Sequence, residues 1–253
     1  MLRPRVIPCL LLRGQALVKT VGFANPSYVG DPVNAVRIFN EKEVDELVLL
    51  DIAATPSGRG PNIELVHDVA SECFMPLAYG GGVRTHAQLQ TLFAVGVEKV
   101  VLNAITHDAP NFLRAASDRH GAQSIVASID VRRDASGVAR VATHGNTRVT
   151  ALDPVAWAEQ LCRDGAGELL VTSVDRDGTQ RGYDVALLAS ITRAVDVPVV
   201  AAGGAGSLLD VRAAIRDAGA SAAALGSMAV YFGRHRAVLI NFPRRADIAA
   251  ALA

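Results

Sequence analysis

The second half of this 253-residue chain repeats the pattern of its first half, and this repeat strongly limits the possible folds. Gly60 corresponds to Gly182 and Gly81 to Gly203, at one constant offset (182 − 60 = 203 − 81 = 122). The second pair of glycines follows an apolar, strand-like run in both copies, and a helical pattern comes next. A strand-then-helix unit repeated at half the chain length predicts two similar half-barrels that close into one α/β fold, a (β/α)8 TIM barrel.

The length and hydrophobic content of the chain fit a single barrel domain. Its halves would span about residues 1–122 and 123–253, and about 250 residues is the usual size of this fold. Half of the residues are hydrophobic, which is enough for one large core. Eight short apolar runs, typical of parallel strands covered on both faces, are the strand candidates: residues 5–12, 46–52, 75–80, 99–102, 124–130, 168–173, 197–202 and 222–225. Helical spacing of apolar residues lies between them at 62–71, 84–95, 151–163, 185–195 and 208–217.

Two segments are longer than a minimal barrel requires. They are residues 13–32, after the first strand, and 132–150, after the fifth. Both occupy equivalent positions in the two halves and extend strand ends on the face where barrels of this type carry their active sites. We therefore predict that both are long functional loops.

The charge balance argues against large charged partners. Lysine and arginine together number 25, aspartate and glutamate also number 25, and there is no long basic run. Broad attraction to nucleic acid or to an anionic membrane is therefore not expected. No apolar stretch reaches the roughly 18 residues of a membrane span, and the N-terminal residues lack a signal-peptide cleavage site. These features predict a cytoplasmic protein.

The cysteines and histidines do not form a metal-binding pattern. Cys9, Cys73 and Cys162 are widely spaced in apolar or helical settings, which predicts buried apolar residues in a reducing compartment. The six histidines lack the spacing of metal ligands and are expected to be solvated surface residues. We predict no metal and no cofactor.

Short turns follow four of the strand candidates, and three of these turns contain glycine. Residues 79–82 end the third strand and 202–207 the seventh, while 103–104 and 226–227 end the fourth and eighth. Each neighbouring pair can offer backbone N–H groups and a small polar side chain to one dianion. Two such sites across the barrel mouth predict a long substrate with a phosphate at each end.

At this point the chain resembles a known family throughout its length, the cyclase subunit of imidazole glycerol phosphate synthase. The matching motifs are Gly30-Asp-Pro32, Asp45-Glu-Leu47, Gly80-Gly-Gly82, Ser128-Ile-Asp130, Ser173-Val-Asp-Arg-Asp-Gly-Thr179 and Gly182-Tyr-Asp184. The resemblance implies a small phosphorylated sugar or nucleotide substrate held at both ends. It also implies ammonia delivered by a class I glutaminase subunit docked on the opposite face of the barrel.

The resemblance also implies which residues hold the two phosphates. One site would use Gly82, Asn103 and Ala104, and the other Asp177, Gly178, Gly203, Gly204, Gly226 and Ser227. Ala104 stands where the family usually has threonine, so one hydroxyl contact is lost. Ala202 likewise replaces the usual serine.

The acid–base pair of the family is incomplete in this chain. The family places one aspartate at the end of the first strand and another at the end of the fifth. Asp130 fits the second role, but the first position is occupied by Leu11, which can neither move a proton nor bond to a substrate nitrogen. Losing one positioned acid or base costs about 10²–10⁴-fold in rate. Asp51 and Asp177 are the nearest candidates to replace it, and Lys19 matches a position thought to close over the substrate.

Four charged residues lie at or beside the starts of strand candidates, on the face opposite the glycine turns. Arg5, Glu46, Lys99 and Glu168 match the family's ring of alternating charges at the barrel floor, which gates ammonia entry. Two positive and two negative side chains can neutralise one another where burial would otherwise penalise them. The resemblance therefore implies that ammonia transfer is retained.

In combining an ammonia gate with an altered barrel mouth, the chain resembles the members of a side branch of the family. Its members work with a glutaminase-like partner and add an amidino nitrogen to a sugar in bacterial surface-polysaccharide pathways. The segments 8–12, 25–32, 72–76 and 235–243 resemble that branch. Three alternatives stay open: a histidine-pathway cyclase that forms imidazole glycerol phosphate and AICAR from PRFAR, a catalytically silent barrel that serves as ammonia conduit or scaffold, and the sister sugar-phosphate isomerase, which has no use for the floor ring.

Overall fold

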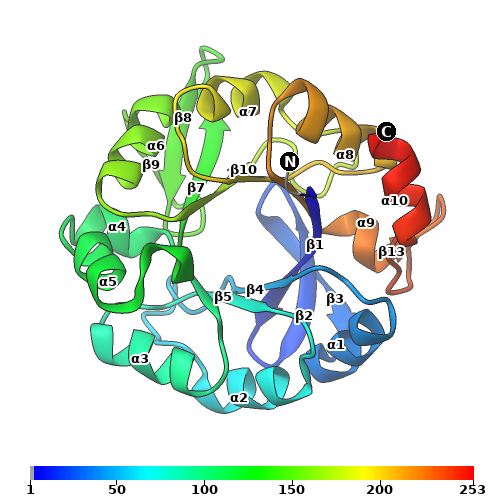
Figure 1. Cartoon of the computed structure of the whole chain (residues 1–253), viewed down its shortest axis with the longest axis horizontal. Helices are drawn as coiled ribbons and strands as arrows, with labels where there is room; N and C mark the ends of the chain where they lie inside the picture. The colour runs from blue at the N-terminus through cyan, green and yellow to red at the C-terminus, as the bar shows by residue number, and fades with distance from the viewer. Residues whose placement is uncertain (1–2) are drawn as a thin grey trace.

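A computed structural model describes residues 3–253, and within them eight parallel strands close into a barrel surrounded by helices (Figure 1). The order of pairing around the barrel is β1–β4–β5–β6–β7–β10–β11–β12 and back to β1. These strands are β1 (Arg5–Arg13), β4 (Leu47–Asp51), β5 (Leu77–Gly80), β6 (Lys99–Leu102), β7 (Ile125–Arg133), β10 (Glu168–Ser173), β11 (Val199–Ala202) and β12 (Ala222–Leu225). The predicted (β/α)8 barrel is confirmed.

Helices cover the outside of the barrel. They are α1 (Pro32–Glu41), α2 (Ile63–Glu72), α3 (His86–Ala94), α4 (Ala104–Asp108), α5 (Phe112–His120), α6 (Pro154–Arg163), α7 (Val185–Thr192), α8 (Leu208–Arg212), α9 (Ser227–Val230) and α10 (Arg245–Leu252). All five predicted helices are present. The predicted helix over 208–217 continues from α8 into a π-helical turn, Ala213–Asp217. The helices α1, α4, α5, α9 and α10 lie outside the predicted helical ranges.

Local sequence signals account for the ends of several helices. Asp31 and Asp153 each precede a proline, and their carboxylates accept hydrogen bonds from backbone N–H groups of the first turns of α1 and α6. Thr85 forms a capping box with Gln88 at the start of α3. Gly96, Gly165 and Gly219, which follow helical segments, all have positive φ.

The two predicted long loops are largely β-hairpins instead. Residues 13–32 contain β2 (Ala16–Val21) and β3 (Ala24–Gly30), and β2 pairs antiparallel with the end of β1. Residues 132–150 contain β8 (Ala139–Thr143) and β9 (Arg148–Val149), and β8 pairs antiparallel with the end of β7. Each hairpin therefore extends a barrel strand and holds its residues in a fixed register over the barrel mouth.

The chain ends with a small hairpin and a helix. Strands β13 (Tyr231–Phe232) and β14 (Ala237–Val238) pair antiparallel after α9. Beyond them, Phe242 packs edge-on against Phe39 of α1, with ring centroids 6.5 Å apart. This contact ties the C-terminal segment to the first helix of the barrel.

Two apolar clusters make up the core. The larger lies between the barrel and its helices, and the smaller fills the barrel interior with Ile7, Val48, Val101, Leu170 and other small side chains. The three cysteines are free, but they are only partly buried, which corrects the prediction of full burial.

The histidines also differ in part from the prediction. His67 and His235 are exposed, whereas His107 stacks on Trp157 and His86 on Phe112. Among residues 3–253, no helix is long and apolar enough to cross a membrane.

Candidate active site at the barrel mouth

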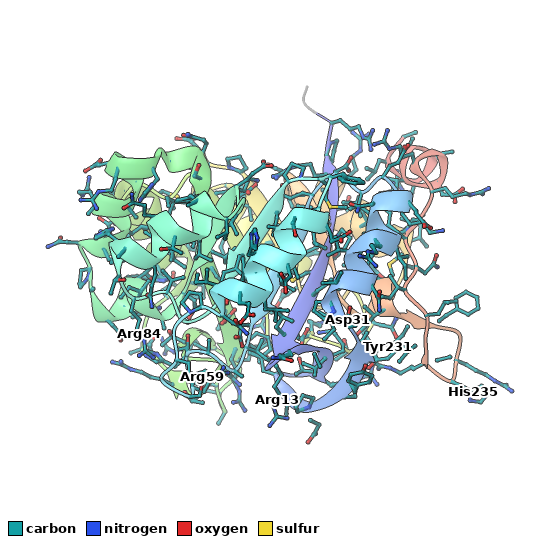
Figure 2. The ribbon with its side chains drawn as sticks, turned by 90° about the horizontal axis from the view of Figure 1, so that it is seen from below. Arg13, Asp31, Arg59, Arg84, Tyr231 and His235 are labelled. Carbon is teal, nitrogen blue, oxygen red and sulfur yellow. The ribbon has the colours of Figure 1, made fainter. Side chains whose placement is uncertain are left out.

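A cavity of about 210 Å³ opens at the carboxyl ends of the strands. Its lining includes residues of all four predicted turns, together with Leu11, Lys19, Asp51, Asp130 and Asp177. The structure thus brings the predicted mouth residues into one site, because parallel strands in a barrel all end at the same face. Figure 2 shows Arg13, Arg59, Arg84 and His235 around this face.

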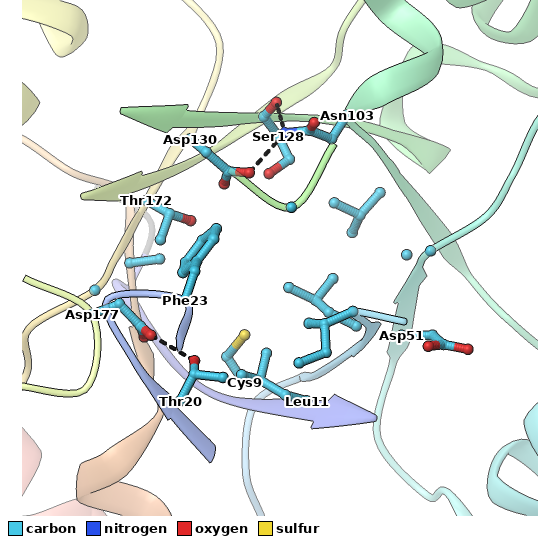
Figure 3. A pocket seen from close by; sticks show the side chains of 18 of the residues that line it. Cys9, Leu11, Thr20, Phe23, Asp51, Asn103, Ser128, Asp130, Thr172 and Asp177 are labelled. Atoms are coloured by element: carbon cyan, nitrogen blue, oxygen red, sulfur yellow. Dashed lines mark hydrogen bonds between the residues drawn. The ribbon is translucent and has the colours of Figure 1, made fainter. Parts of the chain in front are cut away.

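Asp130 lies on one side of the cavity, near the end of β7 (Figure 3). It is 8% exposed, and its Oδ2 accepts a hydrogen bond of 3.1 Å from Asn103 Nδ2. The Asn103 amide is held in that orientation because its Oδ1 accepts from Thr143 Oγ1 at 2.9 Å. Thr143 is fully buried on β8, so the hairpin β8–β9 positions the group that bonds to Asp130.

The pKa of Asp130 is raised from 3.8 to about 7. Burial is the largest cause, and the negative charge of nearby Asp177 adds to it. Hydrogen bonds from Asn103 and Thr172 oppose the shift without cancelling it. A carboxyl group that titrates near neutral pH can both donate and accept a proton at that pH.

A second polar cluster faces Asp130 across the cavity. Lys19 Nζ donates to Asp177 Oδ1 at 2.8 Å, and Thr20 Oγ1 donates to Asp177 Oδ2 at 2.8 Å. All three residues are at least 90% buried. Strand β2 carries Lys19 and Thr20, whereas Asp177 follows β10, so the first hairpin reaches across to the second half of the chain. The ion pair with Lys19 and the hydrogen bond from Thr20 together engage both carboxylate oxygens of Asp177.

Leu11 and Cys9 line the cavity on the same side as Thr20 (Figure 3). Two residues apart on β1, they point to the same side of the strand. Burial raises the pKa of the Cys9 thiol to about 12, so this thiol stays protonated and inert. An apolar side chain and a neutral thiol therefore occupy the wall opposite Asp130.

Asp51 lies at the end of β4, but its carboxylate is turned toward its own backbone. Oδ1 accepts hydrogen bonds from the N–H groups of Ala53 and Ala54, at 2.9 and 3.0 Å. Figure 3 shows this carboxylate directed away from the cavity. Burial raises the pKa of Asp51 above its usual value. The geometry therefore favours a turn-capping role over the catalytic role expected for Asp51.

The repeated glycines of the two halves have equivalent surroundings. Gly81 and Gly203 both have positive φ, at +128° and +80°. A Cβ at either position would lie 2.5 Å from a backbone oxygen of the neighbouring strand end, on Asp51 and Ser173 respectively. Only glycine fits these turns. We refer below to the Gly82 end of the mouth (Gly82, Asn103, Ala104) and to the Ser227 end (Gly178, Gly203, Gly204, Gly226, Ser227).

The four predicted floor residues meet in a closed ring at the opposite face. Lys99 Nζ bonds to Glu46 at 3.0 Å and to Glu168 at 2.9 Å, and Arg5 pairs with the same two glutamates. Both glutamates are buried, at 4% and 5% exposed. Burial lowers the pKa of Arg5, but its pairs with Glu168 and Glu46 outweigh this effect and raise it. All four charges are thus neutralised within the ring.

A narrow space lies directly inside the ring. It is lined by Glu46 and Glu168 and by apolar side chains of the barrel interior, among them Ile7, Val48 and Val101. Val101 also lines the mouth cavity, so its side chain borders both spaces. Floor and mouth are separated by a short apolar layer.

Sequence reasoning missed several residues of the mouth. Thr20 bonds to the Asp177 carboxylate and Thr143 orients the Asn103 amide, while Phe23 projects into the cavity from the β2–β3 turn (Figure 3). None carries a charge or a motif that would single it out. The alternation of apolar and polar residues along the two hairpins was the one sequence signal that could have assigned these residues to the mouth.

Comparison with known proteins identifies the family. The family model described as "Histidine biosynthesis protein" matches residues 5–236. The chain is 49% identical over 243 residues, covering 96% of it and 97% of the relative, to "Putative imidazole glycerol phosphate synthase subunit hisF2" of Pseudomonas aeruginosa. It is 42% identical over 248 residues, 98% of each chain, to "Putative imidazole glycerol phosphate synthase subunit HisF" of Leptospira interrogans. The "Imidazole glycerol phosphate synthase subunit HisF" of Myxococcus xanthus is 47% identical over 223 residues, 88% of each chain. The chain therefore belongs to the histidine biosynthesis protein family, and within it to the HisF-type subunits of imidazole glycerol phosphate synthase.

Proposed function

We propose that this chain is the synthase subunit of a glutamine-dependent amidotransferase. It receives ammonia from a class I glutaminase docked on the floor and transfers the nitrogen to a phosphorylated sugar at the mouth. One observation carries the proposal: the floor ring is complete, while the mouth keeps Asp130 and has Leu11 on the opposite wall. Relatives named as subunits of a synthase support a partner protein.

The barrel interior suits the passage of neutral ammonia. An ammonium ion would lose its hydration in an apolar layer, at a cost of several kcal/mol or more, whereas NH₃ carries no charge. The buried carboxylates of Glu46 and Glu168 line the space inside the ring and can accept hydrogen bonds from NH₃ as it enters. Opening the ring requires Lys99 or Arg5 to move, and both are only partly buried.

At the mouth, Asp130 is the proposed acid–base residue. Its carboxyl group, with a pKa of about 7, can accept a proton from attacking ammonia and return it to the leaving oxygen. Asn103 and Thr143 keep it aimed at the cavity. Lys19 and Asp177 are proposed to position the substrate on the opposite wall. Because Leu11 stands where the family has its second proton-transfer group, the proposed reaction needs only one such group.

The proposed substrate carries an anionic group at each end. The Gly82 end and the Ser227 end each offer a glycine turn in which a bare backbone can approach a phosphate. The finer proposal is that the acceptor is a sugar of the surface-polysaccharide pathways, which gains an amidino nitrogen. The missing carboxylate at Leu11 and the resemblance of four segments to that branch support it.

Lys99→Ala, assayed with two nitrogen sources, tests ammonia transfer. Activity with glutamine and the partner glutaminase is expected to fall much more than activity with free ammonium salt, because the ring acts on ammonia entry and not on the mouth. Lys42→Ala is the matched control, since Lys42 is exposed at the end of α1 and outside the ring. Equal losses with both nitrogen sources would reduce the ring to a structural feature.

A histidine-pathway cyclase is the second candidate. The Myxococcus xanthus relative, at 47% identity, is named as an imidazole glycerol phosphate synthase subunit without qualification. Rescue of a strain that lacks its own cyclase distinguishes the two candidates. Rescue by the unaltered chain would favour the histidine pathway and would assign the second proton transfer to a group other than Leu11. If the chain does not rescue the strain but still binds a glutaminase in a pull-down, the result favours the proposed transfer of nitrogen to a sugar.

A further inference from the structure

The hairpin β13–β14 belongs to the mouth, although no motif of the barrel requires it. It follows α9 directly, and Figure 2 shows Tyr231 and His235 on the mouth side of the molecule. The Tyr231 hydroxyl lies 2.7 Å from Ser27 Oγ, which itself donates to the Lys19 carbonyl at 3.1 Å. Because the serine hydrogen points to that carbonyl, the tyrosine donates to the serine. The hairpin is thus fastened to the strand pair that carries Lys19.

Arg236, just before β14, turns back toward the Ser227 end. Its Nη1 donates to the Gly178 carbonyl at 3.3 Å, and its Nη2 to Ser227 Oγ at 3.4 Å. The guanidinium also lies over the Tyr231 ring, 4.6 Å from the centroid. This cation–π contact helps to hold the guanidinium beside the proposed phosphate site.

The backbone of Arg236 is strained. Its φ is +51°, a left-handed conformation that a long side chain adopts only when its surroundings enforce it. A hydrogen bond of 3.0 Å from its N–H to the Gly233 carbonyl closes the turn. The hydrogen bonds to Gly178 and Ser227 hold the side chain over the site.

The charges around the Ser227 end also favour an anion. A Cβ built on Gly226 would lie 3.4 Å from Lys19 Nζ, so an ammonium group lies against this turn. Asp177 already pairs with Lys19. The hydrogen-bonding partners of Arg236 within residues 3–253 are two uncharged oxygens, which leave its charge without an opposite one. A guanidinium has five donors in a planar fork that matches a phosphate.

We propose that Arg236 is a substrate-binding residue that grips the phosphoryl group at the Ser227 end, together with Ser227 Oγ. This proposal rests on the proposed function for the phosphorylated substrate and names the group that recognises it. The hairpin β13–β14 is then part of the binding site, and its link through Tyr231 and Ser27 joins the phosphate site to Lys19.

Inorganic phosphate serves as the probe, because its binding needs neither glutaminase nor ammonia. Crystals of the full chain soaked in phosphate assign anions to the two ends, and calorimetric titration measures their affinities. Arg236→Gln is expected to weaken binding at the Ser227 end by about 10- to 100-fold, the range for a hydrogen bond to a charged group. The Gly82 end is the internal control. Arg234→Gln is the matched control, since Arg234 is exposed on the same hairpin and contacts His235.

Wild-type affinity at the Ser227 end in Arg236→Gln would overturn the proposal. If that variant does not fold, Arg236→Lys decides, because it keeps the charge but loses the planar fork: weakened binding supports the proposal and unchanged binding overturns it. Absence of nitrogen transfer in the enzyme assay would overturn the proposed function and leave the phosphate result standing by itself. The two failures are therefore distinguishable.

Discussion

Replacing Asp130 by asparagine is expected to stabilise the fold increasingly as the pH rises. In the folded chain the pKa of this buried carboxyl is raised from 3.8 to about 7. Between these two values the unfolded chain has already lost the proton that the folded chain still holds. The contribution of the protonated carboxyl to the stability of the fold is complete below the pKa of the unfolded chain. It is lost as the pH rises through the pKa of the folded chain. Asparagine has no such proton to lose.

The size of the effect follows from the shift. One pKa unit corresponds to about 1.4 kcal/mol, so a shift of roughly three units costs the folded state about 4 kcal/mol above about pH 8. Some of this cost is already present at about pH 5, and about 2–3 kcal/mol of it develops between about pH 5 and about pH 8. The free energy of unfolding of Asp130→Asn, relative to wild type, should grow by that amount over this range.

Urea unfolding of wild type and variant at several pH values measures this difference. Asp134→Asn is the control, because hydrogen bonds from Ser136 lower the pKa of the partly exposed Asp134 to about 2. Both its folded and unfolded values lie below the range tested, so its difference from wild type should not change with pH. A pH-independent difference for Asp130→Asn would refute the raised pKa and, with it, the acid–base role proposed for this residue.

Three further results are expected. The rate of the catalysed reaction should change with an apparent pKa of about 7, and this step should be absent in Asp130→Asn. Gly178→Ala should lower the free energy of unfolding by at least about 2 kcal/mol, since its Cβ would lie 2.2 Å from the Thr20 carbonyl oxygen. The control is Gly14→Ala, which has a similar φ and open space around it and should lower the free energy of unfolding by about 1 kcal/mol. Thermal or urea unfolding measures both. Leu11→Asp should raise cyclase activity with ammonium salt by about 10²-fold or more, and no increase would show that the pocket has diverged beyond that position.

The barrel was predictable because buried parallel strands are short apolar runs. The predicted strand at 99–102 coincides with β6, and the one at 168–173 with β10. The hairpins were not predictable in the same way. Glycine, asparagine and proline at positions such as Gly22 and Asn25 are typical of loops, and only pairing with the end of β1 makes strands of residues 16–30. Tertiary contact overrides local preference there.

The site was predictable in part for a related reason. Residues such as Asp130 follow an apolar strand directly, so the topology alone brings them to the mouth. The direction of a side chain is a different matter: Asp51 also ends a strand, yet its carboxylate caps its own turn. Arg236 could not be placed at all, because it lies in a hairpin whose return to the barrel depends on Tyr231 and on contacts distant in sequence.

The floor ring also determines which halves of the chain can pair. The first half supplies Arg5, Glu46 and Lys99, two cations and one anion, and the second half supplies Glu168 alone. Two copies of the first half would bury surplus positive charge at the floor, and two copies of the second would leave two glutamates facing each other without a cation. Only unlike halves give a neutral floor. The same four side chains therefore act against a barrel assembled from two identical halves.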